Sequence, residues 1–294
     1  MPRSNHEDCL KEYAQASPEP VQWDADGCAL CRPAGWPVHV AYVEGSDSML
    51  FFSGLGRAPS RPPAHFWRTL LTLGYPCPEW IPAVSHEPAT DQWVLSLRLP
   101  AHRYEAARYA QWLEHFGAIA ADGTAALQAP DAPPWRPGVA ATATPRPDVD
   151  LTPYQQAIDA LADRHGAERL HEWAPQRLLL RLDDLDIQLR HGAWTDTLMA
   201  ICRIGGDVAA LDRIGGDLAT VNARMPTSGP HFSIEALSGE LILAGTFDLN
   251  RLLSRDWLDY LDGFHRHALR ARDALSQSAE PADRALPPGS FIFV

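Results

Sequence analysis

The stretch from residue 211 to residue 247 reads LDRIGGDLATVNARMPTSGPHFSIEALSGELILAGTF and contains the pattern that decides the fold. Apolar residues first recur at helical spacing, at Leu211, Ile214, Leu218 and Val221. Pro226 ends that pattern, and two apolar runs follow, over 232–236 and 241–247, around a turn at 237–239. This order predicts a helix followed by a pair of antiparallel strands.

The segments on either side extend the pattern over residues 151–276. Thr152 begins a Thr-x-x-Gln capping box with Pro153 at the first helical position, which predicts a helix that ends near Gly166. Three apolar runs then predict strands over 178–182, 185–189 and 198–204. The last helix has one apolar face, formed by Leu253, Trp257, Leu261, Phe264 and Ala268. The predicted order is α-β-β-β-α-β-β-α.

The first half of the chain repeats this order. Apolar runs predict strands over 28–31, 38–43, 49–52, 80–84 and 93–99, and helical spacing predicts helices over 7–16, 66–73 and 109–116. The interval from Leu73 to Phe116 and the interval from Val221 to Phe264 are both 43 positions. We interpret the chain as a degenerate internal duplication. Each copy is an α+β unit with one antiparallel sheet and helices packed on it.

A proline-rich stretch separates the two units. Proline fixes φ and removes a hydrogen-bond donor, so residues 128–150 are expected to form an extended linker. We therefore divide the chain into a first domain over 1–127, the linker, a second domain over 151–276 and a tail over 277–294. The apolar end of the tail, Phe291–Val294, could add to a sheet edge or dock in a groove.

Composition and charge exclude several classes of function. The chain has 25 basic and 37 acidic residues, so 25 − 37 gives a net charge of −12, which disfavours binding to nucleic-acid phosphates. Lys11 is the only lysine and no glycine-rich loop precedes it, which excludes a P-loop and a buried Schiff-base lysine. No apolar run is long enough to span a membrane. With five cysteines and no signal peptide at the N-terminus, we expect a cytoplasmic protein with reduced thiols.

Four local features accompany the element order. They are acidic turns after the first strand (24–27 and 183–184), a helix ending in Leu218–Asn222, a strand pair over 232–243, and an aromatic-bearing last helix over 257–275. Together they resemble the class I type III secretion chaperones, the Tir-chaperone or CesT-like family. The resemblance covers nearly all of 151–276 and, more weakly, 7–120.

Members of that family are small, acidic cytoplasmic proteins that dimerise and hold the N-terminal segment of a secreted effector in extended form. The resemblance implies a non-enzymatic chaperone or adaptor that binds an effector or an export-apparatus protein through apolar sheet surface and strand addition. Family members usually carry one copy per chain. Two copies can form a pseudo-dimer within one polypeptide or pack in another way, so the chain is expected to be a monomeric pseudo-dimer or a homodimer.

The predicted strands supply the expected client contacts. Both faces of the strands over 38–43 and 49–52 are apolar, so each face needs a cover, either the sister domain or an exported client. We expect client contacts at apolar positions of four strands, namely Val38, Val40, Tyr42, Leu50, Phe52, Leu185, Ile187, Leu189, Leu241 and Leu243.

No other cluster predicts a catalytic, metal or cofactor site. Cys28 and Cys31 have no second ligand pair for zinc, and their odd separation places the thiols on opposite faces of a strand. His265 and His267 lie about 200° apart around a helix, so they do not share a metal. The Asp183–Asp186 acids fit a hairpin turn, where aspartate bonds the local backbone.

The segment Arg203–Asp207 recurs ten residues later as Arg213–Asp217. It lacks the G-x-G-x-x-G spacing of a dinucleotide-binding turn. We expect the first copy to end a strand and the second to lie in or near a helix. Gly215 and Gly216 would then be explained only by a close approach of another backbone.

Two other classes of function stay open. One is a structural or regulatory component of the secretion apparatus with the same fold, which should co-purify with export proteins. The other is an enzyme with a carboxylate or histidine site, which should show a concave pocket with converging ionisable groups.

Overall fold

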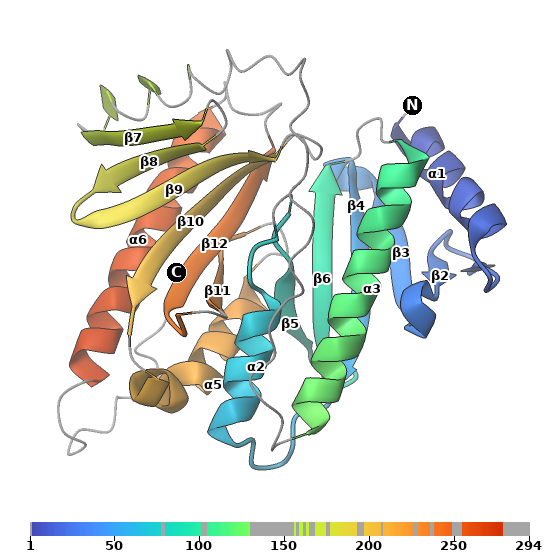
Figure 1. The fold of residues 1–294 in the computed structure, drawn as a ribbon, viewed down its shortest axis with the longest axis horizontal. Helices are drawn as coiled ribbons and strands as arrows, with labels where there is room; N and C mark the ends of the chain where they lie inside the picture. The colour runs from blue at the N-terminus through green and yellow to red at the C-terminus, as the bar shows by residue number, and fades with distance from the viewer. Residues whose placement is uncertain are drawn as a thin grey trace.

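Two six-stranded antiparallel sheets form the framework of the computed structural model (Figure 1). The structure describes residues 2–77, 80–100, 105–129, 168–174, 177–192, 197–206, 208–225, 229–235, 238–248 and 255–278, with a few positions between 156 and 164. Sheet A has the strand order β1-β2-β3-β4-β6-β5 and sheet B the order β7-β8-β9-β10-β12-β11. The two orders match position for position, which confirms an α+β fold built from two similar units.

Sheet A comes from the first half of the chain. Its strands are β1 (Gln22–Trp23), β2 (Ala29–Cys31), β3 (Val38–Val43), β4 (Ser48–Gly56), β5 (Ala83–Glu87) and β6 (Gln92–Pro100). The helices of this half are α1 (Pro2–Ala16), α2 (Ala64–Leu73) and α3 (Ala106–Gln128), and short 3-10 turns lie at η1 (Pro33–Gly35) and η2 (Glu44–Ser46). Helix α3 packs on β4 and on α1.

Sheet B comes from the second half. Its strands are β7 (Glu168–Ala174), β8 (Arg177–Leu182), β9 (Leu185–Gly192), β10 (Thr197–Gly205), β11 (His231–Ile234) and β12 (Leu241–Asp248). The helices are α5 (Val208–Arg224) and α6 (Arg255–Ser278), and α6 packs on β10 and β12. In Figure 1, α3 lies in front of sheet A whereas α6 lies behind sheet B, so the two units present opposite sides to the viewer.

Three of the strand predictions need correction. The order α-β-β-β-α-β-β-α omits the outer edge strands β1 and β7, because β1 has only two residues and the β7 sequence ERLHEWA lacks the regular apolar alternation of central strands. An edge strand pairs on one side only and can form without that alternation. The strand predicted over 80–84 is β5, which begins at Ala83. Pro82 has no N–H for the ladder, and Trp80 and Ile81 pack into apolar clusters instead.

Both predicted acidic turns are confirmed. Asp183 and Asp184 have φ values of 44° and 62°, which make the two-residue hairpin turn between β8 and β9. In the first half, the Asp24 carboxylate accepts hydrogen bonds from the backbone N–H groups of Asp26 (3.0 Å) and Cys28 (2.8 Å). Aspartate in these turns therefore stabilises local backbone.

A glycine-containing irregularity appears at the same place in both sheets. The register of β4 against β6 shifts between Gly54 and Gly56, and that of β10 against β12 shifts between Arg203 and Gly205. Gly56 and Gly205 adopt φ values of 95° and 91°, which favour glycine. The first copy of the repeated segment thus ends a strand, as predicted. The shared irregularity supports the duplication.

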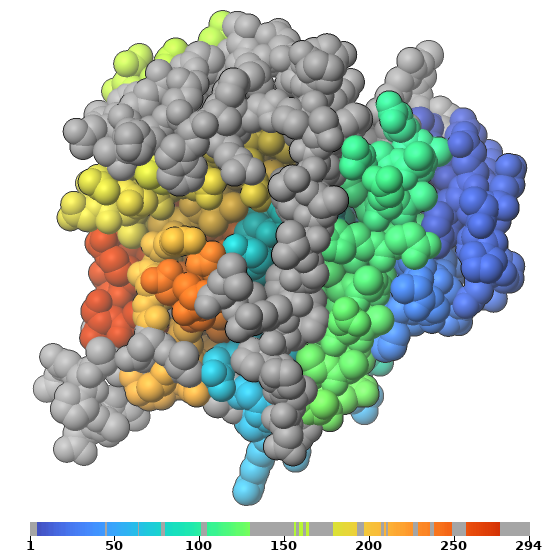
Figure 2. Space-filling model, in the orientation of Figure 1, coloured from blue at the N-terminus to red at the C-terminus, as the bar shows by residue number. Residues whose placement is uncertain are grey.

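The two halves pack against each other through reciprocal contacts. Helix α2 contacts α5, and the two lie side by side in Figure 1. Helix α2 also contacts β11, and α5 contacts β5. Each helix therefore packs on the inner edge strand of the other half, as in a two-fold dimer interface. The two halves therefore pack on each other within one polypeptide, and Figure 2 shows residues of the α2–β5 region adjoining the second half. Whether the chain is a monomer or a homodimer stays a prediction.

Trp67 explains the two glycines of α5. A Cβ at Gly215 would lie 2.9 Å from the Trp67 Cβ, and one at Gly216 would lie 3.2 Å from the indole ring. One helical turn away, Arg68 forms an ion pair with Asp212 at 2.8 Å. The second copy of the repeated segment therefore lies in a helix, and its glycines admit a tryptophan from the other half.

Several predicted features lie outside the described residues. These are the capping box at Thr152, nearly all of the linker over 128–150, and all but the first residues of the tail over 277–294, including Phe291–Val294. The domain boundaries therefore stay predictions. Among the described helices, none is both long and apolar enough to cross a membrane.

Candidate client-binding surface

The register of sheet A separates its apolar side chains onto two faces. Val40 pairs with Phe51 across β3 and β4, and both are buried on the face covered by α3. Ala41 pairs with Leu50 and His39 pairs with Phe52, so these four side chains share the other face. The His39 and Phe52 rings stack with centroids 4.9 Å apart.

We call this second surface the open face of sheet A. Its partly exposed side chains on β2, β3, β4 and β6 are Leu30, His39, Ala41, Val43, Leu50, Phe52, Val94 and Arg98. All of these but His39 and Arg98 are apolar. Ser48 and Ser96 lie on the same face, opposite Val43 and Phe52, and are buried at 4% and 2% exposure. In a sheet with one face already packed on helices, a partly exposed apolar second face is a candidate binding surface.

The ten residues expected to contact a client fall into two groups, three that are partly exposed and seven that are buried. Tyr42, Leu50 and Phe52 are partly exposed, with Leu50 and Phe52 on the open face. Tyr42 lies on the helix-covered face, and its hydroxyl bonds the Asp47 carboxylate at 2.5 Å. The other seven belong to the hydrophobic core and are at most 3% exposed: Val38, Val40, Leu185, Ile187, Leu189, Leu241 and Leu243.

Those seven residues need a correction. Their side chains lie on the faces that pack against the helices, so in this structure no client can touch them. In β3, β4 and β12 the sequence pattern could not choose the face, because apolar side chains lie on both faces. In β9 the alternation with Asp186, Gln188 and Arg190 already favours burial of Leu185, Ile187 and Leu189. Met49 and Phe51 are core residues at 1% and 0% exposure, whereas Leu50 between them is partly exposed.

The first half of the chain covers part of the corresponding face of sheet B, whereas Ile201, at the place of Phe52, is partly exposed. Met199, Ile242 and Ala244 are at most 1% exposed and form a cluster with Ile81, against which Tyr75 packs. Tyr75 and Ile81 belong to the segment between α2 and β5. A segment of the first half therefore occupies the second half's sheet surface.

Hydrogen bonds between the halves hold that segment in place. The Arg190 guanidinium donates to the Cys77 carbonyl at 2.7 Å. The Ser233 hydroxyl donates to the Leu71 carbonyl at 2.9 Å, at the end of α2. The Tyr75 hydroxyl donates to the buried Glu235 carboxylate at 3.2 Å. Burial and the nearby carboxylate both raise the pKa of Tyr75, so its hydroxyl keeps the donated proton.

Only the outer sheet edges are available for strand addition among the described residues. The inner edge strands, β5 and β11, contact α5 and α2. The outer edges are β1 and β7. Trp23 on β1 is 45% exposed, and no other large apolar side chain among the described residues exceeds it. Strand addition at β1 would therefore place a client beside Trp23.

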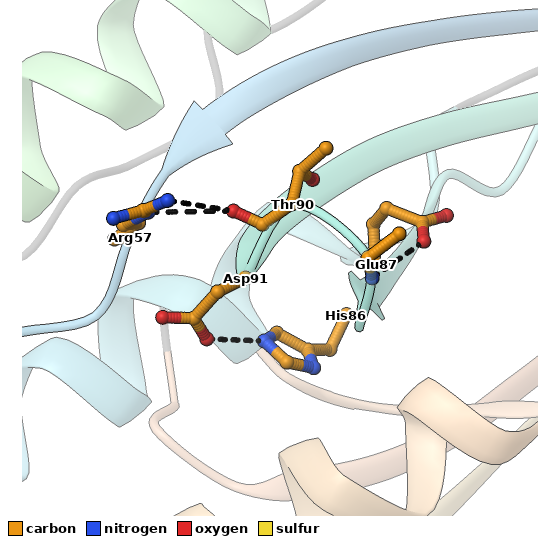
Figure 3. Close-up of polar contacts among 6 residues, drawn as sticks. Arg57, His86, Glu87, Thr90 and Asp91 are labelled. Atoms are coloured by element: carbon orange, nitrogen blue, oxygen red, sulfur yellow. Dashed lines mark hydrogen bonds and ion pairs between the residues drawn. The ribbon is translucent and has the colours of Figure 1, made fainter.

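The β5–β6 hairpin carries a group of polar contacts (Figure 3). His86 contacts the Asp91 carboxylate at 3.1 Å, and Arg57 donates to the Thr90 carbonyl at 3.2 Å. The His86 ring also packs on the Trp93 indole, with their ring centroids 5.1 Å apart. These bonds close a turn in which Asp91 has a φ of 53°, so the group stabilises the hairpin.

The thiols are held in their protonated form. Cys31 is buried, and desolvation raises its pKa to about 12. Burial also raises the pKa of Cys202 to about 12 and that of Cys9 to about 11. Cys28 is partly exposed, and burial together with the Asp24 carboxylate raises its pKa. No thiol in this group has the lowered pKa of a nucleophile.

The remaining candidates from the sequence have structural partners. Asp186 forms an ion pair with Arg181 at 2.9 Å across β8 and β9. His265 lies 3.7 Å from the Asp183 carboxylate, so this histidine contacts the hairpin turn of sheet B. Within the described residues, no group of three or more His, Cys, Asp or Glu side chains could hold a metal ion.

Comparison with solved structures finds four matching chains. No protein-family model matches the chain, and no curated protein matches it. A chain in the structure of the HopA1-SchA chaperone-effector complex aligns at 13% identity and a TM-score of 0.32. The alignment covers 44% of this chain and 99% of that chain. A TM-score of this size carries no functional argument.

Proposed function

We propose that this protein is a non-enzymatic chaperone or adaptor of the cytoplasm that holds an extended segment of a type III secretion client against the open face of sheet A. The observation that carries the proposal is the contrast between the two sheets. Met199 on sheet B is fully buried beneath the first half, whereas Leu50, which occupies the same place on sheet A, is partly exposed.

An extended segment suits this surface. The open face is one layer of side chains on a sheet. In such a layer the Cβ atoms of opposed residues lie about 4.5–5.5 Å apart, so alternate residues of an extended segment can pack on it. Burying a Leu or Phe side chain contributes about 1.5–3 kcal/mol. Leu50 and Phe52 together therefore supply enough apolar surface for a specific but reversible contact.

The proposal assigns no enzymatic step and no cofactor to the chain. Raised thiol pKa values and the structural partners of Asp186 and His265 support it. A net charge of −12 keeps an apolar complex in solution.

Co-expression with the products of neighbouring genes, followed by affinity purification, tests the proposal. We expect a stable complex with the N-terminal segment of a secreted protein. Phe52→Asp should weaken that complex at least about tenfold, because it removes apolar contact and adds an unpaired charge. Ile201→Asp is the matched control, since Ile201 is partly exposed and lies at the same place in β10 as Phe52 in β4.

Trp23→Asp separates face binding from edge binding. If the complex survives Phe52→Asp but is lost with Trp23→Asp, the client adds a strand at β1 and the open face is not its site. If only export-apparatus proteins are recovered, the chain is a component of the secretion machinery instead.

A further inference from the structure

The open face of sheet A contains one cation, Arg98. Arg98 pairs with Leu50 across β6 and β4, so its side chain lies beside the apolar positions of that face. Its Nε donates to the Ser48 hydroxyl at 2.9 Å, and one terminal nitrogen donates to the Ser46 hydroxyl at 3.0 Å. The two serine hydroxyls lie 2.7 Å apart, and Ser46 also contacts the Val43 carbonyl at 3.4 Å.

These serines orient the guanidinium without neutralising it. An arginine has five N–H groups, and two of them bond the hydroxyls, so N–H groups remain for a further acceptor. Among the described residues, no carboxylate forms an ion pair with Arg98, and burial is the one cause that shifts its pKa, although the chain has 37 acidic residues. Burial accordingly lowers the pKa of Arg98, and no negative charge offsets that effect.

A desolvated cation without a counter-ion lowers the stability of the folded protein. Proteins keep such an unfavourable group mainly at functional sites, so Arg98 is a candidate for binding an anionic group of a partner. Sheet B has Thr246 in the same place on β12, opposite Met199, so the fold itself does not require arginine here. A guanidinium with a fixed orientation and free N–H groups is a preorganised site for a carboxylate.

We propose that the Arg98 guanidinium binds a carboxylate of the client segment. The preferred client therefore carries an aspartate or glutamate flanked by apolar side chains. This inference rests on the proposed function, because it names the chemistry of the segment that occupies the open face. Since Leu50 lies directly opposite Arg98, the client needs an apolar side chain within about two residues of its carboxylate.

An array of extended nonapeptides tests this specificity on the full chain. The central residue is glutamate, glutamine or lysine, and the flanking positions vary among valine, isoleucine, leucine and threonine. We expect the glutamate series to bind about tenfold or more tightly than the glutamine series, as for one charge-assisted hydrogen-bonded pair. Arg98→Gln should abolish the difference. Arg57→Gln, which removes an exposed arginine from the same half, should retain it.

Thermal unfolding distinguishes recognition from a structural role. Because Arg98 has no counter-ion within the described residues, Arg98→Gln should leave Tm within about 2 °C of the original value or raise it. A larger loss of Tm would assign Arg98 to the fold and overturn the inference.

Three other outcomes of the peptide array would change the assignment of the open face. Peptides that bind without a preference for glutamate overturn the inference and leave the proposed function standing. Peptides that bind only after Phe291→Asp and Phe293→Asp are introduced would make the chain's own tail the occupant. Absence of any binding would overturn both proposals.

Discussion

Trp67 brings α2 close to α5 in the contact between the two halves. Its side chain lies against Gly215 and Gly216 of α5, where an added Cβ would meet the Trp67 Cβ or its indole ring. Glycine inside a helix costs about 1 kcal/mol relative to alanine. The chain carries two adjacent ones because the close approach of α2 and α5 requires them.

Replacing Gly215 by alanine should therefore destabilise the protein by about 1–3 kcal/mol, because the new Cβ lies 2.9 Å from the Trp67 Cβ and forces the helices apart. Gly263→Ala in α6 is the control, since no atom lies within 4 Å of its added Cβ, and a gain of up to about 1 kcal/mol is expected. Urea unfolding measures both. Equal stability of the two variants would contradict the packing of Trp67.

Burial also predicts the order in which the cysteines react. Cys28 is partly exposed, whereas Cys9, Cys31, Cys77 and Cys202 are buried. Iodoacetamide at pH 8 should alkylate Cys28 first, and slowly, because its pKa is raised. The other four should react only after unfolding. Peptide mass mapping measures the order, and early labelling of Cys31 would contradict the burial of β2.

At the scale of elements, the sequence predicted strands well where apolar residues alternate. β3, β6, β10 and β12 lie within a residue or two of their expected positions. β7 was missed because an edge strand needs no such alternation. The end of α5 is also fixed by tertiary structure, since the buried Asn222 side chain bonds both the N–H (2.8 Å) and the C=O (2.7 Å) of Phe232.

The inner edge strand of sheet B makes stability depend on pH. Complete desolvation of His231 on β11 lowers its pKa to about 4, against an ordinary value near 6.5. The unfolded chain therefore binds a proton between those pH values that the folded chain does not. Stability should fall as the pH falls through this window, by about 3 kcal/mol in all.

Urea unfolding between pH 7 and pH 4 measures that slope. His231→Gln should reduce it by about one proton taken up on unfolding. Desolvation also lowers the pKa of His115 and His267, so these histidines leave a residual slope of the same sign. An unchanged slope in the variant would show that His231 is protonated in the folded protein.

At the scale of the whole molecule, the two halves have the same strand topology but differ in which sheet face is covered. The sheets share one strand order, and α2 and α5 pack reciprocally. The connection from α2 to β5 spans residues 74–82, whereas that from α5 to β11 spans 225–230. The longer connection carries Tyr75 and Ile81 across to sheet B. A fused pair can diverge in this way, whereas identical subunits cannot.

That asymmetry could not be predicted from apolar patterns. Leu50 and Met199 are both apolar residues of central strands, and only the tertiary path of the 74–82 segment distinguishes them. The sequence left open whether the sister half or a client covers each apolar face. It could not say which of Leu50, Met199 and Leu243 stays accessible, because apolar residues flank all three.

Site-specific photo-crosslinking tests the central claim most directly. Benzoylphenylalanine is placed at His39 on the open face of sheet A, or at Gln188, the matched position on sheet B. Each full chain is purified with its co-expressed client and irradiated, and the masses of the products are measured by mass spectrometry. The account predicts an adduct of one chain and one client from position 39 and none from position 188. Crosslinking from both positions, or from position 188 alone, would contradict a single client surface on sheet A.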